Sequence, residues 1–248
     1  MLAEYENITA VNGENLTLND TLDCSQATDS ADIESIVSDA VSAGVKNKIV
    51  YRTVKRIFDI VSSVCGMVLL SPLFLIVAIL IKKEDGGPVF FIQERTGLNN
   101  KTFKMYKFRT MCENASEMHK FLLDQNELDG PAFKMKDDPR ITKIGKTLRK
   151  TSIDELPQLL NILKGEMSVV GPRPLPVYET DQMTPQEMTR HLVKPGLTCY
   201  WQVMGRTEIP FDEWMELDQK YLRKRSIATD IGLIVMTFRA LKAGDGAY

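Results

Sequence analysis

The sequence predicts an α+β fold that is mostly helical, with short strands, one long apolar membrane helix and a compact domain. Three observations lead to this prediction. Residues 60–81 contain no charged side chain, and residues 89–108 hold two stretches in which apolar and polar side chains alternate. Later segments repeat apolar residues at helical spacing. The composition, 44% hydrophobic and 26% charged residues, excludes a wholly disordered chain.

Residues 1–48 form an acidic leader that we expect to be flexible. They hold nine of the 33 acidic residues but two of the 31 basic residues, so the rest of the chain is mildly basic. No basic start followed by an apolar run marks a signal peptide. A short helix over residues 32–45 is compatible with the pattern. Because the net charge of the chain is −2, we expect no nucleic-acid partner.

Residues 49–85 are expected to form a juxtamembrane and membrane segment. A straight helix over the uncharged residues 60–81 would span about 33 Å, which is enough to cross the apolar core of a bilayer. Ser71 and Pro72 fall in its middle. Proline removes one backbone donor and clashes with the carbonyl near Val68, so the helix should bend there. The Ser71 hydroxyl can satisfy a carbonyl that this bend frees.

Basic side chains flank the apolar run on both sides, which by the positive-inside rule favours a cytoplasmic location for both ends. A bent, re-entrant helix that enters and leaves one leaflet accounts for the proline and for the flanks. A kinked helix that crosses the membrane is the alternative, and a buried helix of a soluble core is a third. The flanking residues are Arg52, Lys55 and Arg56 before the run and Lys82 and Lys83 after it.

Residues 86–248 are expected to form the compact domain. Two prolines within three residues make Gly171–Pro172–Arg173–Pro174 a rigid loop. A helix predicted at 230–242 carries an apolar stripe, which suits either a membrane surface or a protein core. The stripe consists of Ile231, Ile234, Val235, Phe238 and Leu241. Strands are predicted at 89–93 and 102–108, a turn at 137–139, and further helices at 113–129, 141–150, 154–164, 184–193 and 211–225.

Cysteine and histidine patterns indicate no soft-ligand metal site. The four cysteines, at positions 24, 65, 112 and 199, lack CxxC spacing, and the two histidines, at 119 and 191, lie far apart. A reducing compartment suits a chain with this cysteine usage. If the protein binds a metal, oxygen ligands must hold it, which favours Mg²⁺.

Candidate catalytic residues concentrate within residues 148–174. Asp154 and Glu155 are adjacent carboxylates at the start of a predicted helix, with Arg149 before them and Arg173 in the rigid loop after them. A helix N-terminus and basic side chains both favour bound phosphate. In such a site one carboxylate can attack phosphorus while a second holds a metal. The pattern therefore suits phosphoryl transfer.

The same residues have a purely structural interpretation. Ser152 stands three residues before Glu155, which is typical of a capping box at a helix start. The basic residues elsewhere recur in short motifs, and each one alone is more commonly a surface group or a salt-bridge partner. They are Arg95, Lys107, Arg109, Arg140 and Arg206.

Several motifs together make the sequence recognisable from residue 51 to residue 248. They are KRIFD at 55–59, Ser71-Pro72, FIQERTG at 91–97, YKFRTM at 106–111, DPRITKIG at 138–145, LRKTSIDELPQLLNILKGEMSVVGPRP at 148–174, KPGLT at 194–198, WQVMGR at 201–206 and LDQKYL at 217–222. With these motifs the chain resembles the bacterial sugar transferases. These are monotopic polyprenyl-phosphate phosphoglycosyl transferases that initiate capsule, exopolysaccharide and O-antigen synthesis.

The resemblance implies a re-entrant helix broken at Ser71 and Pro72, followed by a catalytic domain on the cytoplasmic face of the bacterial inner membrane. It implies transfer of a hexose 1-phosphate from a UDP-sugar to undecaprenyl phosphate, with release of UMP. Asp154 would be the nucleophile, forming a covalent aspartyl-phosphosugar intermediate, and Glu155 would bind Mg²⁺. Membrane lipids would be further partners, and a homo-oligomer is compatible with the sequence.

The resemblance also implies a set of substrate-binding residues: Lys107, Arg149, Arg173, Arg206 and Asp218. The stretch Cys199–Tyr200–Trp201 departs from the Gly-Trp pair that often follows GLT in this family. The leader lies outside the resemblance, and the chain is expected to be a minimal catalytic form. Two other functions stay open at this point: a non-catalytic membrane-anchored module of polysaccharide assembly, and a membrane-anchored phosphatase or hydrolase. The sequence does not identify the sugar.

Overall fold

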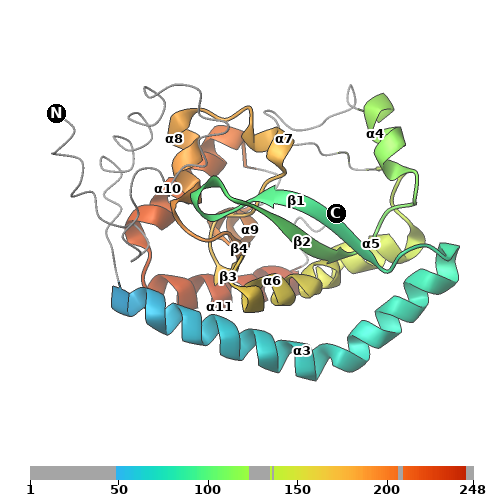
Figure 1. The fold of residues 1–248 in the computed structure, drawn as a ribbon, viewed down its shortest axis with the longest axis horizontal. Helices are drawn as coiled ribbons and strands as arrows, with labels where there is room; N and C mark the ends of the chain where they lie inside the picture. The colour runs from blue at the N-terminus through green and yellow to red at the C-terminus, as the bar shows by residue number, and fades with distance from the viewer. Residues whose placement is uncertain (1–48, 123–134, 136, 206–208, 244–248) are drawn as a thin grey trace.

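The computed structural model describes residues 49–122, 135, 137–205 and 209–243. The acidic leader 1–48, with the short helix expected at 32–45, lies outside the described residues, and so does Arg206. The described residues form a mostly helical domain with two small sheets, and the long helix α3 (Ile49–Asp85) runs along one side of it (Figure 1). This agrees with the predicted α+β class.

Helix α3 bends along its length (Figure 1), and its sequence contains Pro72 within the helix. The Ser71 Oγ donates a hydrogen bond to the Val68 carbonyl at 2.8 Å, as expected for a carbonyl that proline leaves without its usual donor. Among the described helices, α3 alone is long and apolar enough to cross a membrane. Only 11% of its most apolar 18-residue window is buried, which argues against the core helix of a soluble protein.

One stripe of α3 packs on the domain, and most of its other apolar side chains are exposed. Met67 and Phe74 contact a core cluster that includes Phe103 and Ile162. Further along the helix, Val77 and Ile81 belong to a second cluster with Phe108 and Leu148. These contacts fix one face of the helix against the domain. The exposed side chains along the helix include Ile57, Phe58, Val61, Val64, Val68, Leu69, Leu75, Ile76, Ile79 and Leu80.

Strands β1 (Phe90–Thr96) and β2 (Thr102–Phe108) form an antiparallel hairpin, with Phe90 opposite Phe108 and Thr96 opposite Thr102. The strand predicted at 102–108 is confirmed with its boundaries. The strand predicted at 89–93 begins one residue later and continues to Thr96. On β2, Phe103 and Met105 share one face, where they pack with Leu159 and Ile162 of α6 (Leu159–Lys164). Phe108 falls outside that alternation, and it packs with Val77 and Ile81 of α3.

The segment after the hairpin contains α4 (Ala115–Leu122), α5 (Lys143–Lys150) and the 3₁₀ helix η4 (Ile153–Gln158), which leads into α6. Helix α5 begins two residues later than predicted, because the Thr142 side chain caps it by accepting from the Gly145 amide. The predicted helix 154–164 is a 3₁₀ turn followed by an α-helix. The second half of the predicted helix 113–129 lies largely outside the described residues.

The C-terminal part contains α7 (Val177–Thr180), α8 (Pro185–Met188), η5 (Thr189–Leu192), α9 (Tyr200–Met204), α10 (Phe211–Lys224) and α11 (Ile227–Ala243). The helix predicted at 211–225 is confirmed as α10. The predicted helix 184–193 is divided into α8 and η5. Helices α7 and α9 were not predicted, because four or five residues are too few to show a helical period.

A short parallel pair, β3 (Ser168–Val170) with β4 (Gly196–Thr198), was also not predicted. Each strand has three residues, too few for an alternating pattern to be visible. At its end the two backbones approach so closely that a Cβ on Gly171 would lie 2.3 Å from the Lys194 carbonyl oxygen. A Cβ on Gly196 would lie 2.1 Å from the Gly171 nitrogen. Glycine at both positions therefore permits this close contact. The contact lies at the start of the rigid loop Gly171–Pro172–Arg173–Pro174, called the proline-rich loop below.

The apolar stripe of α11 divides between core and surface. Ile234 packs against the cluster that contains Tyr221, Leu222 and Leu233. The remaining stripe residues are exposed: Ile231, Val235, Phe238 and Leu241.

Candidate active site

The predicted carboxylate pair lies on η4, directly after a residue in an unusual conformation. Ser152 has φ +56° and ψ +18°, in the left-handed region that non-glycine residues adopt rarely. Its side chain makes no capping hydrogen bond, so the capping-box interpretation of Ser152 and Glu155 is wrong. After this turn, Glu155 lies within hydrogen-bond distance of Lys107 on β2 and of Arg173 in the Gly171–Pro174 loop. Residues in such rarely adopted conformations cluster at functional sites.

Glu155 is held by two cations that come from distant parts of the chain. The Lys107 Nζ, near the end of β2, donates to the Glu155 Oε1 at 2.8 Å. The Arg173 Nη2, in the loop after β3, donates to the same oxygen at 2.9 Å. Burial would raise the pKa of Glu155, but Arg173 and Lys107 outweigh it and hold that pKa well below its ordinary value. Glu155 is therefore ionised at neutral pH.

Asp154 has different surroundings although it is the adjacent residue. Its exposure is 8%, and within the described part of the chain its carboxylate accepts no hydrogen bond and forms no ion pair. Burial raises the pKa of Asp154 to about 6, and the charge of Glu155 adds to the rise, while Lys107 and Arg149 oppose it. The two carboxylates thus differ in pKa because only one of them is paired, a pattern typical of catalytic pairs.

Arg149 completes the basic side of the site. It lies in the last turn of α5, and its Nε donates to the Thr110 Oγ1 at 3.0 Å. Burial lowers its pKa, whereas the nearby charge of Asp154 raises it. An arginine stays protonated at any physiological pH. The predicted residues Lys107, Arg149 and Arg173 therefore all lie around the pair of Asp154 and Glu155, called the dyad below.

Of the other two predicted residues, one lies apart from the two carboxylates and the other is not described. Asp218 lies on α10, is 1% exposed, and pairs with Arg190 instead of contacting the dyad. Arg206 lies outside the described residues. The structure adds Arg95, whose Nη1 donates to the Pro174 carbonyl at 3.1 Å. The FIQERTG motif pointed to Arg95, but nothing in the sequence singled out Arg190.

The carboxylates can accommodate a Mg²⁺ ion only with help from other ligands. Among the described residues there is no group of three His, Cys, Asp or Glu side chains that could hold a metal. Of the Glu155 carboxylate, Oε1 accepts both hydrogen bonds, and Oε2 accepts none from the residues the structure covers. Magnesium is commonly bound by one or two carboxylates together with water and substrate phosphates. The dyad fits that pattern.

Comparison with known proteins gives a consistent result. The family model described as bacterial sugar transferase matches residues 50–244. The galactosyl transferase CpsE of Streptococcus agalactiae is 45% identical over 196 residues, 78% of this chain and 43% of that protein. The undecaprenyl-phosphate galactose phosphotransferase of Salmonella typhimurium is 39% identical over 201 residues, 79% of this chain and 42% of that protein.

A relative of similar size also matches. The exopolysaccharide production protein ExoY of Rhizobium meliloti is 39% identical over 198 residues, which cover 78% of this chain and 88% of that protein. The first two relatives are longer, and the chain matches less than half of the length of each.

Proposed function

The chain belongs to the bacterial sugar transferase family, and from this premise we propose that it is a glycosyl-1-phosphate transferase. It moves a hexose 1-phosphate from a UDP-sugar to undecaprenyl phosphate and releases UMP, in the first membrane step of exopolysaccharide, capsule or O-antigen synthesis. The relative named as an undecaprenyl-phosphate galactose phosphotransferase supports these two substrates. The observation that carries the proposal is a difference between two neighbours: Glu155 binds Lys107 and Arg173, whereas Asp154 has no hydrogen-bond or ion-pair partner among the described residues.

In the first half-reaction Asp154 is the nucleophile. One of its carboxylate oxygens attacks the phosphorus that bears the sugar, a P–O bond to the aspartate forms, and the bridging bond to the UMP phosphate breaks. A buried carboxylate that accepts no hydrogen bond from the described residues suits this role, because none of these residues engages its electron pairs and its basicity is raised. UMP leaves, and the sugar phosphate remains bound to Asp154.

In the second half-reaction a phosphate oxygen of undecaprenyl phosphate attacks the same phosphorus. The bond to Asp154 breaks, the carboxylate is regenerated, and the product is a polyprenyl diphosphate sugar. The donor thus reacts with Asp154 first, and the acceptor then reacts with the phosphosugar bound to Asp154. Because UMP is released before the acceptor reacts, ping-pong kinetics are expected.

The cations around the dyad bind and orient the phosphates. Lys107, Arg149 and Arg173 approach the two carboxylates from three different elements. Positive groups fixed by the fold stabilise the charge that develops on the phosphoryl oxygens without reorganising during the reaction. Glu155 holds two of these cations in place and offers its second oxygen to a Mg²⁺ ion. When bound, Mg²⁺ neutralises charge on the phosphate oxygens.

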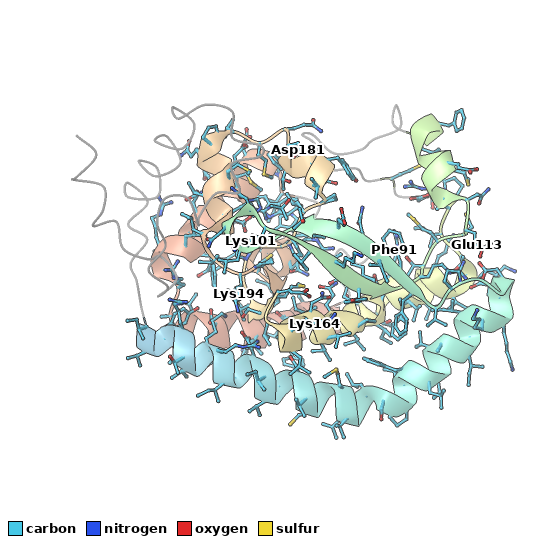
Figure 2. All side chains as sticks on the ribbon, viewed as in Figure 1. Phe91, Lys101, Glu113, Lys164, Asp181 and Lys194 are labelled. Carbon is cyan, nitrogen blue, oxygen red and sulfur yellow. The ribbon has the colours of Figure 1, made fainter. Side chains whose placement is uncertain are left out.

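The enzyme is monotopic in the bacterial inner membrane, with its domain on the cytoplasmic face. The exposed apolar side chains of α3 and α11 support contact with a bilayer. Figure 2 places Lys164 and Lys194 on the side of the domain that faces α3. Cations in that position suit the anionic headgroups of the cytoplasmic leaflet.

Contacts at both ends of α3 support the re-entrant arrangement. Near its start, Lys55 and Tyr51 both bind the Asp230 carboxylate, at 2.7 and 2.8 Å. At its end, Asp85 forms an ion pair with Arg109, which follows β2. Both ends are thus attached to one domain. Because one compact domain lies on one side of a membrane, these attachments support the proposal that both ends of α3 are on the same side.

The proposal is tested by incubating the purified protein with undecaprenyl phosphate, Mg²⁺ and a panel of UDP-sugars that includes UDP-galactose, UDP-glucose and acetamido sugars. The expected result is UMP release with one member of the panel and formation of a polyprenyl diphosphate sugar. Free sugar phosphate without a lipid product would indicate a hydrolase. No turnover with any donor, together with normal polysaccharide synthesis by Asp154→Asn in cells, would indicate a non-catalytic module.

A further inference from the structure

Arg190 and Asp218 form a buried ion pair that reaches the proline-rich loop. Arg190 lies on η5 and Asp218 on α10, and each is 1% exposed. The Arg190 Nε donates to the Asp218 Oδ2 at 2.9 Å, and its Nη2 lies 2.7 Å from the same oxygen. The Nη2 also donates to the backbone carbonyl of Arg173 at 2.8 Å. The pair therefore contacts the main chain of a residue whose side chain binds Glu155.

A stack of aromatic rings makes a second connection between the two arginines. Trp201 and Trp214 stack with ring centroids 4.3 Å apart and planes inclined by 16°. The Arg190 guanidinium lies 5.6 Å from the Trp214 ring, and the Arg173 guanidinium lies 5.7 Å from the Trp201 ring. Both distances suit a cation–π contact. Arg173 is thus held through its carbonyl by Arg190 and through its guanidinium by Trp201 and Glu155.

The loop around Arg173 has unusual backbone bonding. Pro172 and Pro174 have no amide hydrogen, so the loop cannot hold itself in a sheet or a helix. Instead, four successive carbonyls each accept a hydrogen bond from outside the loop. The donors are the Gly196 amide to Pro172 at 2.8 Å, Arg190 to Arg173 at 2.8 Å, Arg95 to Pro174 at 3.1 Å and the Thr96 amide to Leu175 at 3.0 Å.

Stability alone does not account for the pair. A buried ion pair often contributes little net stability, because desolvation of both charges offsets their attraction. Here the Arg190 Nη1 is also buried without a hydrogen-bond partner among the described residues, which adds a cost. A costly charged pair at this position is better explained by its contact with the Arg173 main chain, whose position it fixes.

We propose that Arg190 and Asp218 are positioning residues that fix the Arg173 main chain, and thereby hold the Arg173 guanidinium on Glu155 and on the substrate phosphate. The inference rests on the proposed function for its kinetic consequence, but its structural consequence can be measured separately. Lysine at position 190 would keep a charge opposite Asp218. It would lack the planar fork that binds the carboxylate and the Arg173 carbonyl together.

The kinetic test is a double-mutant cycle between Arg190→Lys and Arg173→Ala, read as kcat/KM for UMP release. Arg190→Lys alone should lower kcat/KM by roughly 10- to 100-fold, the size of effect that a misplaced catalytic group produces. In the Arg173→Ala background the same substitution should lower it by no more than about threefold, because its target is already absent. Losses that simply multiply would overturn the proposal.

A control and a second variant keep this test decisive. Asp230→Asn alters a buried carboxylate that binds Lys55 and Tyr51, so any effect it has should multiply with that of Arg173→Ala. If Arg190→Lys does not fold, Asp218→Asn takes its place in the cycle, since it removes the charge and keeps the shape. Multiplying losses for Asp218→Asn would equally contradict the inference.

Hydrogen exchange separates this inference from the proposed activity. The Gly171 amide donates to the Thr198 carbonyl at 3.0 Å and the Gly196 amide donates to Pro172 at 2.8 Å, so both report on the loop. Arg190→Lys should make these two amides exchange at least about tenfold faster. Unchanged exchange would overturn the inference even in an active enzyme. Faster exchange in a protein that uses no UDP-sugar would support the loop contact. It would contradict only the proposed transferase activity.

Discussion

The Lys107 Nζ lies 2.8 Å from the Glu155 Oε1, which also accepts the hydrogen bond from Arg173. This contact joins the β1–β2 hairpin to the dyad. It also gives the two adjacent carboxylates different surroundings. Glu155 binds two cations and is ionised, whereas Asp154 is buried, has no ion-pair partner in the described part of the chain, and has its pKa raised to about 6. Neighbouring carboxylates thus differ in pKa because their surroundings differ, which suits the proposed roles of Asp154 as nucleophile and Glu155 as its charged partner.

We expect Asp154→Asn to stabilise the folded protein. Because burial raises the pKa of Asp154 from 3.8 to about 6, the ionised carboxylate costs folding free energy above that range, and asparagine removes the cost. Thermal melting at pH 7.5 should show a Tm higher by about 5 °C. The gain should shrink at pH 5, where the wild-type carboxyl is mostly protonated.

The exposed Asp181 offers a matched control for this measurement, and Asp181→Asn should leave the Tm nearly unchanged. A lower Tm for Asp154→Asn than for the wild type would mean that the charged carboxylate is stabilised by its surroundings, contrary to this description of the site.

The rate of UMP release should rise with pH through about 6. In the proposed mechanism Asp154 attacks as the carboxylate, so protonation below its pKa would remove the nucleophile, while Glu155 stays ionised over the same range. Single-turnover assays without the lipid acceptor avoid the titration of its phosphate. A rate that is constant between pH 5 and 8, in protein shown to stay folded, would rule out Asp154 as the titrating nucleophile.

Removal of divalent cations should abolish turnover, and Mg²⁺ should restore it. Glu155→Gln should raise the Mg²⁺ concentration needed for half-maximal rate, or remove activity, because an amide is a weaker ligand for a hard cation. Glu213→Gln, an exposed change on α10, is the control and should behave like the wild type. A wild-type enzyme that works at full rate in metal-free buffer would refute the requirement.

Both ends of α3 should be labelled from the cytoplasmic side. Cysteines placed at the exposed positions Val50 and Lys83, in a chain whose other cysteines are serine, can be tested with an impermeant reagent on spheroplasts and on inverted vesicles. Labelling of the two positions from opposite sides would establish a crossing helix.

Replacing Pro72 with alanine should shift this result toward a straight, crossing helix. Alanine restores the backbone donor to the Val68 carbonyl, which Ser71 now satisfies, and removes the clash that bends α3. The same pair of labelling positions measures the shift. Unchanged topology and unchanged bending in the Pro72→Ala protein would show that the attachments at Asp85 and Tyr51 alone impose the arrangement.

Residue patterns predicted the helices and strands that are long enough to show a repeated pattern. Strand β2 and helix α10 were found because seven and 14 residues are enough to display alternation or a helical face. The three-residue strands β3 and β4 show neither pattern. Their pairing depends on Gly171 and Gly196, which meet only once the whole domain has folded.

The two carboxylates, their cations and different roles for Asp154 and Glu155 were expected from the motifs and the resemblance, but the contacts that distinguish the two carboxylates were not. The sequence could not show that Glu155 binds Lys107 and Arg173 rather than the backbone near Ser152, because these partners are 48 and 18 residues away. Arg190 had no sequence signal at all. Its contacts with Asp218 and the Arg173 carbonyl depend on η5 lying beside both α10 and the proline-rich loop, which is a property of the tertiary structure.

The most direct test of the account is covalent labelling of the protein by the donor substrate. Wild-type protein incubated with Mg²⁺ and a UDP-sugar labelled in the sugar, without undecaprenyl phosphate, should acquire the label and release up to one UMP per active site. Asp154→Asn should do neither, although it remains folded. Labelling of the Asp154→Asn variant would place the nucleophile elsewhere. A wild type that releases UMP only when the lipid acceptor is present would contradict the covalent route and favour direct transfer.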